Sequence, residues 1–517
     1  MRHPAQGKAG DRYAVEPTMQ QDQKYWLRKA QRVDLEIRDF IDGRWHEVPD
    51  REVKKYSPRD GQLLCEYGDG GSRQVDIAVS GARRAFQDGR WSKMPVQQRK
   101  EVLCRLAALL EEHRHEFALR ECLDVGKPIT DALQFDVPAA AACIRFNAEA
   151  ADKCYGKVYA TDFTSLSYQL RRPVGVVAGV IGWNFPLYQA AQKIGPVLAT
   201  GNTLILKPSE LTAFSAARLA HLSLEAGVPE GVLNVVHGAA SVGSALAQHS
   251  DVDCITFTGS TRTGKQILIS SGSSNMKRPI LECGGKAPNI VFNDCPDLSA
   301  AAEAIVASAY WNQGQVCVAS SRLLVQDDVK GELLAAVIRK TESLLMGDPL
   351  DPRTRYGALI SAGHRNKVSG YIERATQDGA RMAFRSPAPV PIEGGFYVPP
   401  TIFDDVTPQQ ALAQDEIFGP VLAVLTFRDE AEAIAIANGT MYGLSTILWT
   451  SDPGRAHRLS QALDFGWIVV NTTGRPQGGP AEGVMSVGGQ KQSGLGLEGG
   501  VEGLEAYLKS STVQIFS

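Results

Sequence analysis

Several signals that would place a chain of 517 residues outside the ordinary globular classes are missing from this sequence. The longest almost purely apolar run, Val174 to Gly182, is about half of a membrane span. The polar N-terminus lacks the apolar core of a secretory signal. The net charge is only −3, so neither nucleic acid nor a membrane is an expected partner. The remaining composition is that of a globular protein, long enough for two or three domains.

Motifs for metal binding and for paired thiols are missing as well. The nine cysteines are scattered, and no two of them have the C-x-x-C spacing. The nine histidines are dispersed, and no H-E-x-x-H occurs. We therefore expect no catalytic metal, and we expect a reduced, cytoplasmic setting.

One cysteine has unusual neighbours. Cys317 lies among small, apolar and amide-bearing residues, with no acid or base for several positions on either side. A thiol reacts as the thiolate, and with an unperturbed pKa of about 8.5 only a small fraction is ionised at neutral pH. A reactive Cys317 would therefore need a base, an oxyanion donor and an electron acceptor from elsewhere in the chain. The alternative is a buried structural cysteine.

From Pro173 onward, apolar strands alternate with helical patterns. Strands are expected at 174–181, 203–206, 233–236 and 254–257, with helices at 188–199, 213–226 and 242–248. This succession predicts a doubly wound parallel sheet whose ligand binds at the carboxyl ends of the strands. A second α/β run begins near Pro288 and continues to about residue 480. Mostly helical patterns cover residues 72–151, and residues 155–172 indicate a hairpin.

The first motif at a strand end is Gly182-Trp183-Asn184-Phe185-Pro186. The amide of Asn184 could donate a hydrogen bond to a developing oxyanion at that edge. The alternative is a cap or turn asparagine.

The second motif is Lys207-Pro208-Ser209-Glu210, directly after strand 203–206. Glu210 could accept from a ribose hydroxyl and would repel a 2′-phosphate, and Lys207 could reach an adenosine ribose. The alternative is a strand-to-helix turn with Ser209 or Thr212 as the cap.

The third motif, Gly259 to Lys265, nearly matches the phosphate loop G-x-x-x-x-G-K-[ST], but Gln266 replaces the hydroxyl that would bind magnesium. It favours a phosphate near a helix N-terminus and disfavours a nucleotide triphosphatase. The fourth motif is Leu281-Glu282-Cys283-Gly284-Gly285. Glu282 is expected to be semi-buried, with a pKa raised towards the range of a general base. The alternative for Glu282 is a salt bridge with Lys286.

Taken together, these motifs resemble the NAD(P)-dependent aldehyde dehydrogenase superfamily, and the resemblance runs from about Phe40 to the C-terminus. Six blocks match in family order: 173–186, 201–210, 281–285, 312–319, 416–420 and 488–494. The resemblance implies a Rossmann-like doubly wound cofactor domain, an α/β catalytic domain and a small β oligomerisation element.

The resemblance also implies roles for individual residues. Cys317 would attack the aldehyde, Asn184 and the Cys317 N–H would hold the oxyanion, and Glu282 would activate water to hydrolyse the thioester. Lys193 and Glu498 correspond to a proton relay behind Glu282. NAD, with NADP as a second possibility disfavoured by Glu210, would be the cofactor. Its contacts would be Ile181, Gly182, Trp183, Lys207, Ser209, Glu210, Gly259, Ser260, Glu416 and Phe418.

The resemblance leaves the aldehyde open. The expected substrate pocket comprises Gln189, Gln192, Val316, Val318 and Arg475. The two glutamines replace residues that are apolar in many relatives, so we expect a polar or acidic semialdehyde. Val487 replaces a common aromatic residue, which indicates a less aromatic pocket. The alternatives are a CoA-acylating relative, disfavoured by Glu282, and a catalytically silent binding protein.

The resemblance implies the following domain boundaries and assembly. Residues 1–36 would be an N-terminal lead-in, 37–154 with 173–284 the NAD-binding domain, and 285–490 the catalytic domain. Residues 155–172 and 505–517 would form oligomerisation strands that pair across subunits in a homodimer or homotetramer.

Overall fold

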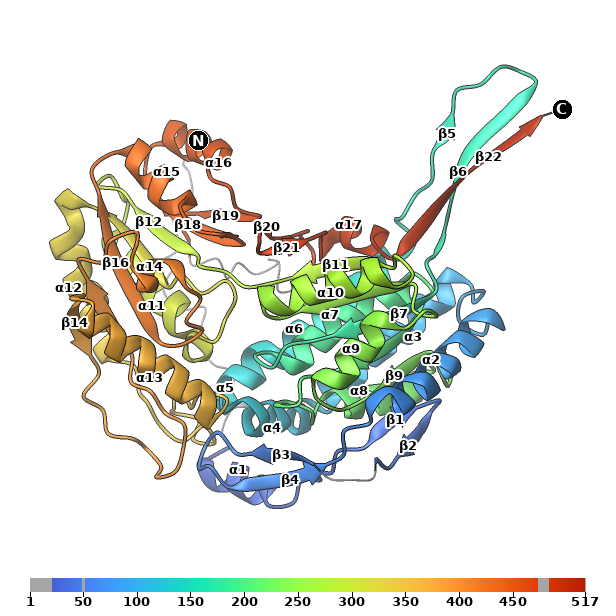
Figure 1. Cartoon of the computed structure of the whole chain (residues 1–517), viewed down its shortest axis with the longest axis horizontal. Helices are drawn as coiled ribbons and strands as arrows, with labels where there is room; N and C mark the ends of the chain where they lie inside the picture. The colour runs from blue at the N-terminus through green and yellow to red at the C-terminus, as the bar shows by residue number, and fades with distance from the viewer. Residues whose placement is uncertain (1–20, 49–51, 473–482, 517) are drawn as a thin grey trace, which may run out of the picture.

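The computed structural model describes residues 21–48, 52–472 and 483–516 of the chain. It consists of two α/β lobes and a β arm that projects from the larger lobe (Figure 1). The predicted α/β fold class, with parallel strands in both lobes, is confirmed.

The larger lobe is built on an eight-stranded sheet of order β2-β1-β9-β8-β7-β10-β11-β21. Its parallel strands are β7 (Val176–Val180), β8 (Thr203–Lys207), β9 (Leu233–Val235), β10 (Cys254–Thr258) and β11 (Arg278–Glu282). Antiparallel pieces extend both edges: β1 (Asp39–Ile41), β2 (Arg44–His46) and β21 (Gly494–Leu495). The order reverses between β7 and β10, which is where doubly wound sheets open a ligand crevice.

Helices cover both faces of this sheet, which explains why β7 is apolar throughout. Val176 and Ala178 face a core shared with α2 (Gly71–Gln87), α9 (Ala240–Gln248) and α10 (Thr261–Ser273). Val177 faces the opposite core. That core is built by α3 (Val96–Glu112), α4 (Arg114–Val125), α6 (Val137–Ala150), α7 (Pro186–Ala199) and α8 (Ala216–Ala226).

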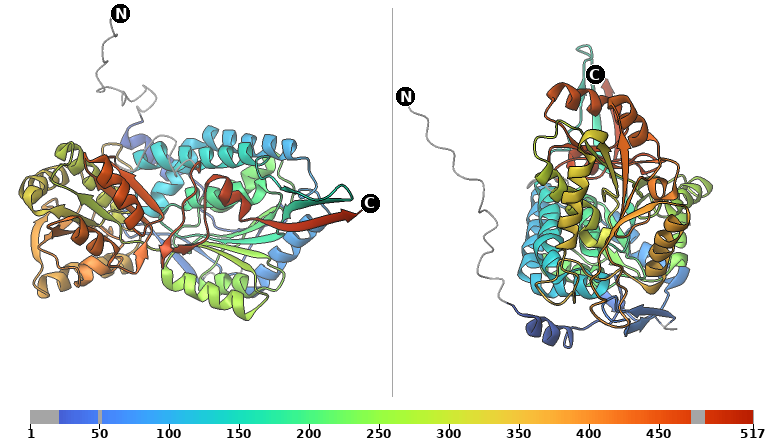
Figure 2. Two further views of the ribbon diagram at one scale, coloured as in Figure 1. Left: turned by 90° about the horizontal axis from the view of Figure 1, so that it is seen from above. Right: turned by 90° about the vertical axis from the view of Figure 1, so that its left-hand side faces the viewer.

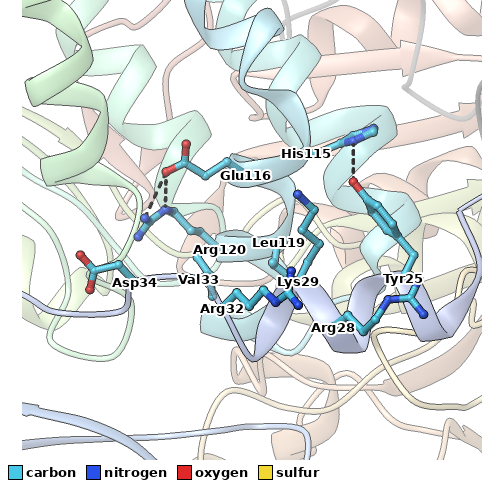
Figure 3. Close-up of a pocket in the computed structure, with 10 residues that line it drawn as sticks. All are labelled: Tyr25, Arg28, Lys29, Arg32, Val33, Asp34, His115, Glu116, Leu119 and Arg120. Carbon is cyan, nitrogen blue, oxygen red and sulfur yellow. Dashed lines mark hydrogen bonds and ion pairs between the residues drawn. The ribbon is translucent and has the colours of Figure 1, made fainter.

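The N-terminal helix α1 (Gln23–Ala30), which lies in the expected lead-in 1–36, packs against α4. Trp26 is buried in the core of the larger lobe, and the Tyr25 hydroxyl lies 3.3 Å from His115 Nδ1. A pocket of about 530 Å³ lies between the two helices (Figure 3). The Arg120 guanidinium in it already contacts the Glu116 carboxylate and the Phe214 carbonyl. Residues 1–20 lie outside the described part.

The smaller lobe has a seven-stranded sheet of order β14-β15-β16-β13-β12-β18-β19. The strands are β12 (Pro288–Val291), β13 (Arg322–Gln326), β14 (Arg381–Arg385), β15 (Thr401–Asp404), β16 (Val421–Phe427), β18 (Ser445–Trp449) and β19 (Trp467–Val470). All neighbours are parallel except β14 with β15. α11 (Leu298–Tyr310) and α12 (Lys330–Glu342) cover one face, and α13 (Ala362–Gln377), α15 (Glu430–Asn438) and α16 (Pro453–Ala462) cover the other.

The arm is a three-stranded antiparallel sheet of order β22-β6-β5 that extends beyond both lobes (Figures 1 and 2). β6 (Ser165–Pro173) pairs along its whole length with β22 (Leu508–Phe516), and β5 (Val158–Tyr159) adds a short edge. Apolar side chains on the arm face solvent, including Val158, Phe163 and Phe516. Within the described ranges, no helix is long and apolar enough to cross a membrane.

Candidate active site

The site lies where the two sheets meet. The carboxyl ends of β7, β10 and β11 carry Asn184, Ser260 and Glu282 on the larger lobe. The segments that precede β13 and β16 carry Cys317 and Glu416 on the smaller lobe. Asn184 Nδ2 donates to Gln315 O at 2.9 Å, and the Gly285 N–H donates to Glu416 Oε1 at 3.0 Å, so the motifs from both lobes are in direct contact.

The loop before Cys317 has an unusual backbone. Asn312, Gln313 and Gly314 have φ angles of 47°, 60° and 73°, in the left-handed region that non-glycine residues seldom occupy. The Asn312 side chain donates to Asn184 O at 2.9 Å, which holds the turn against the larger lobe. A Cβ on Gly314 would lie 2.4 Å from Gly419 O. The turn is therefore held by contacts on both sides, which offset a strain of about 1–3 kcal/mol per residue.

Cys317 is half-buried and has no cation beside it among the contacts that shift its pKa. Burial, together with the Glu416 and Glu282 carboxylates, raises the pKa of the thiol to about 12, and the Val318 and Cys317 N–H groups oppose this shift. In the free protein the thiol is therefore protonated at neutral pH. Ionisation must accompany ligand binding or proton transfer to a base.

Glu282 lies at the end of β11, where burial raises its pKa well above the usual range. The neighbouring Glu498 adds to this shift, and Lys193 opposes it. Glu282 Oε1 is buried and has no hydrogen-bond partner. The alternative of a salt bridge with Lys286 is not found in the described residues, because Lys286 Nζ is also buried without a partner. A carboxyl group with this environment is suited to a general base.

A buried ion pair lies next to Glu282. Lys193 Nζ on α7 donates to Glu498 Oε1, and both side chains are nearly inaccessible to solvent. Thr256 Oγ1 on β10 donates to the same carboxylate oxygen at 3.3 Å. The charges of Lys193 and Glu498 both act on the Glu282 carboxyl group. A proton donor and a proton acceptor therefore lie in one buried cluster with Glu282.

Asn184 is held by hydrogen bonds on both ends of its amide. Gln189 Nε2 donates to Asn184 Oδ1 at 2.7 Å, and Gly182 N–H donates to Gln189 Oε1 at 2.7 Å. One N–H of Asn184 is used by Gln315 O, so the second is free for a ligand. Gln189 was expected to line the substrate pocket. Its amide is turned towards Asn184, and the residue as a whole is 5% exposed.

The residues expected to contact the cofactor follow the carboxyl ends of β7, β8 and β10 or precede β16. Trp183 packs edge-on against Phe418, with 5.1 Å between ring centroids, and against His364 at 5.2 Å. Phe418 lies in the loop before β16 and has a φ of 61°, in the left-handed region. The Lys207 side chain is buried, and its Nζ lies 3.5 Å from Glu210 Oε2. The Ile181 N–H donates to Lys207 O at 3.1 Å.

The third motif opens α10 in the way that a phosphate site requires. Ser260 caps the helix by accepting from Thr263 N–H, and Gly259 N–H donates to Glu282 O at 2.9 Å. The Thr258 hydroxyl beside them is buried without a partner. A 13-residue helix with uncovered N–H groups at its start fits the phosphates of a dinucleotide.

Four aromatic rings lie beside the cysteine loop. Trp311 lies 4.6 Å from Phe135 and 4.9 Å from Phe185, measured between ring centroids, and Phe135 lies 5.7 Å from Tyr188. They pack together with Val316 and Val318 on either side of Cys317.

The expectation of a less aromatic pocket stays a prediction. It rested on Val487, which pairs with Glu498 through backbone hydrogen bonds. The rings come from other segments, and Phe135 in particular has no motif to mark it. Gln192 Nε2 donates to the Tyr188 hydroxyl at 3.2 Å. Arg475 lies outside the described residues. Among those that are described, no group of histidine, cysteine and carboxylate side chains could hold a metal.

Comparisons with known proteins agree with this geometry. The profile of the Aldehyde dehydrogenase family matches residues 45–513. The chain is 44% identical over 495 residues to the NADP/NAD-dependent aldehyde dehydrogenase PuuC of Escherichia coli, covering 95% of this chain and 98% of that protein. It is 42% identical to the aminoacetaldehyde dehydrogenase of Pseudomonas aeruginosa, covering 90% and 93%. The crystal structure of an indole-3-acetaldehyde dehydrogenase with NAD⁺ superposes with a TM-score of 0.92 at 43% identity, covering 96% and 100%.

Proposed function

The chain belongs to the aldehyde dehydrogenase family and oxidises an aldehyde to a carboxylic acid with NAD as the electron acceptor, and on this premise we propose how its residues carry the reaction. The observation that carries the proposal is the convergence of Cys317, Glu282 and Asn184 where the two sheets meet. Bound NAD supplies the group that accepts a hydride from the substrate.

We assign the covalent steps to Cys317. Its thiolate adds to the aldehyde carbon and forms a thiohemiacetal. The free N–H of Asn184 and the backbone N–H of Cys317 donate to the developing oxyanion. Oxidation leaves a thioester on Cys317. Glu282 then takes a proton from the attacking water, and the carboxylic acid is released from the thiol. The Lys193–Glu498 pair passes that proton away from the buried carboxylate.

We assign the cofactor contacts to the crevice between β7 and β10. The N-terminus of α10, with Gly259 and Ser260, would hold the pyrophosphate, together with Ile181, Gly182 and Trp183. Lys207, Ser209 and Glu210 would contact the adenosine ribose, and Glu416 and Phe418 would contact the nicotinamide side. Glu416 suits a ribose hydroxyl because only one of its oxygens is engaged, by the Gly285 N–H.

We propose that the substrate has a flat or apolar stem and a polar end. Phe135, Phe185, Tyr188 and Trp311 favour the stem, and the Gln192–Tyr188 hydrogen bond supplies a polar contact that could pair with a distal amide, amine or carboxylate. One relative is named for aminoacetaldehyde, an aldehyde with a polar end, and one structural neighbour is named for indole-3-acetaldehyde, an aldehyde with a flat stem. Comparing kcat/KM across semialdehydes, aminoaldehydes, aromatic aldehydes and hexanal tests this proposal, and a preference for hexanal would contradict it.

The proposed reaction is hydrolytic and does not acylate CoA. The buried Glu282, with an unpaired oxygen, supports attack by water rather than by a thiol cofactor. NADH formation without CoA is expected, and a strict requirement for CoA would contradict the assignment.

We propose that the arm mediates assembly into a homodimer or homotetramer. The open outer edges of β22 and β5 and the exposed Phe163, Val158 and Phe516 support pairing between subunits. Residues 155–172 and 505–517 would then be the oligomerisation strands. Residues 37–154 with 173–284 would bind NAD, and residues 285–490 would carry the cysteine. Light scattering of the chain with Phe163→Asp and Phe516→Asp tests the assembly, and an unchanged mass would contradict it.

We also propose that the protein works in a reducing cytoplasm. All nine cysteines are free, and thiol chemistry at Cys317 requires that it remain so. Cell fractionation would test this location.

The primary test of the proposed function is NADH formation by Cys317→Ala. We expect a loss of about 10³-fold or more in kcat with NAD binding retained, because the covalent route is removed. Cys295→Ala, which removes a half-buried thiol packed in the smaller lobe, is the matched control and should keep the parent's activity.

A further inference from the structure

Three hydrogen bonds form a series from the Gly182 N–H through the side chains of Gln189 and Asn184 to the Gln315 carbonyl, and their donors all point the same way along it. The Gly182 N–H donates to Gln189 Oε1 at 2.7 Å, and Gln189 Nε2 donates to Asn184 Oδ1 at 2.7 Å. Asn184 Nδ2 then donates to the Gln315 carbonyl at 2.9 Å. The first donor is a backbone N–H and the last acceptor is a backbone carbonyl. Neither end of the series can reverse its role.

The two ends set the orientation of both side-chain amides between them. Rotation of the Gln189 amide by 180° would bring its NH₂ against the Gly182 N–H and its oxygen against Asn184 Oδ1. Rotation of the Asn184 amide would bring its oxygen against the Gln315 carbonyl. Both side chains are buried, so water cannot replace the lost hydrogen bonds. One orientation of each amide is therefore strongly favoured.

The helix that carries Gln189 is itself held at its start. Pro186 occupies the first turn of α7, and no side chain of its own segment caps the helix. Glu121 on α4 supplies the cap by accepting from the Leu187 N–H at 3.3 Å, and Ser215 Oγ donates to the same carboxylate at 2.6 Å. Gln189 is thus presented to Asn184 from a fixed position.

We propose that Gln189 is a positioning residue that fixes the polarity of the Asn184 amide. The second N–H of Asn184, and not its carbonyl oxygen, then faces the aldehyde oxygen. This inference rests on the proposed function, in which that N–H stabilises the oxyanion. A reversed amide would place a partial negative charge against the developing oxyanion and remove its stabilisation.

Two substitutions at Gln189 test the inference because they differ in hydrogen bonding. Gln189→Met removes both bonds and is expected to lower kcat about tenfold or more, with the KM for NAD unchanged. Gln189→Glu keeps the acceptor for Gly182, but only its protonated form can donate to Asn184 Oδ1. Its kcat, relative to the parent at the same pH, should therefore rise as the pH falls. The ratio is the quantity to compare, since Cys317 and Glu282 titrate in every variant.

Control variants separate positioning from general damage. Gln248→Met and Gln248→Glu, on the exposed side of α9, should keep the parent's kcat and pH profile. Asn184→Ala should lose about 10²–10³-fold in kcat, and Gln189→Met added to it should cause no further loss. If Asn184→Ala keeps the parent's kcat, the proposed oxyanion role of Asn184 fails, and with it the premise of this inference.

The positioning role itself has separate contradicting results. If Asn184→Ala loses activity while Gln189→Met and Gln189→Glu do not, the positioning role is wrong. In Gln189→Glu, a loss relative to the parent that is the same at every pH would contradict it as well. So would a loss in Gln189→Met that follows a lower unfolding midpoint or that adds to the loss of Asn184→Ala.

Discussion

Gly285 lies so close to Cys317 that a Cβ on the glycine would stand 2.3 Å from the Cys317 carbonyl oxygen. The segment between β11 and β12 thus passes against the backbone of the cysteine loop. This contact joins the glutamate motif of one lobe to the cysteine motif of the other, although they are remote in sequence.

Gly285→Ala is expected to displace the cysteine loop, because a backbone carbonyl cannot move aside as a flexible side chain can. We expect kcat to fall by about 10²-fold and stability to fall by about 1–3 kcal/mol, measured by NADH formation and denaturant unfolding. Gly272→Ala is the matched control, since its Cβ would meet no atom within 4 Å in α10. It should be as stable as the parent or slightly more so. Full activity in Gly285→Ala would contradict this account.

The raised pKa of Cys317 predicts how the free enzyme reacts with iodoacetamide. Because burial and two carboxylates raise the pKa of this thiol to about 12, the thiolate fraction keeps growing throughout the accessible range. The alkylation rate at Cys317, followed by peptide mass, should rise about tenfold per pH unit from about pH 7 to about pH 10 without levelling off. A rate that levels off above about pH 9, as for an unperturbed thiol, would contradict the raised pKa of Cys317.

The Lys193–Glu498 pair should be sensitive to removal of one partner. Lys193→Met leaves a carboxylate buried without its cation, and we expect a loss of about 3–5 kcal/mol in the free energy of unfolding. Adding Glu498→Gln should recover part of that loss. Arg428→Met, which breaks an exposed pair with Glu432, should leave the unfolding midpoint almost unchanged. If the single and double variants at the buried pair unfold alike, the pair does not act as a unit.

Glu210 predicts cofactor preference. Its carboxylate, near the buried Lys207 ammonium, would repel a 2′-phosphate. Glu210→Gln should raise kcat/KM for NADP about tenfold relative to that for NAD. Glu225→Gln, on the exposed side of α8, should leave the ratio unchanged. If the ratio of kcat/KM for NADP to that for NAD is the same in Glu210→Gln and Glu225→Gln, Glu210 does not set the cofactor preference.

Much of the fold was predictable because each βαβ unit is a local pattern. The fully apolar strand at 176–180 and the helices between the strands follow from the hydrophobic period. Because Asn184 and Glu282 both follow parallel strands, they were also predicted to lie at the same edge of the sheet, where β10 separates their two strands.

Features that depend on tertiary contact were not predictable. Nothing local marks Asn312 and Gln313 for left-handed backbone, which only the packing of both lobes enforces. Gln189 could not be assigned to Asn184 from sequence, because its rotamer depends on Gly182 and Gln315. Phe135 comes from a π-helical turn that no motif indicates, and it reaches the other rings only through the fold.

The central claim is that catalysis proceeds through a thioester on Cys317 that Glu282 hydrolyses. The most direct test is to mix Glu282→Gln with aldehyde and NAD and to measure the intact and peptide masses after rapid quenching. The account predicts a burst of about one NADH per subunit. It also predicts a mass increase equal to the acyl group on the Cys317 peptide, removable by hydroxylamine. Steady turnover without an adduct, or an acyl group on any other residue, would contradict it.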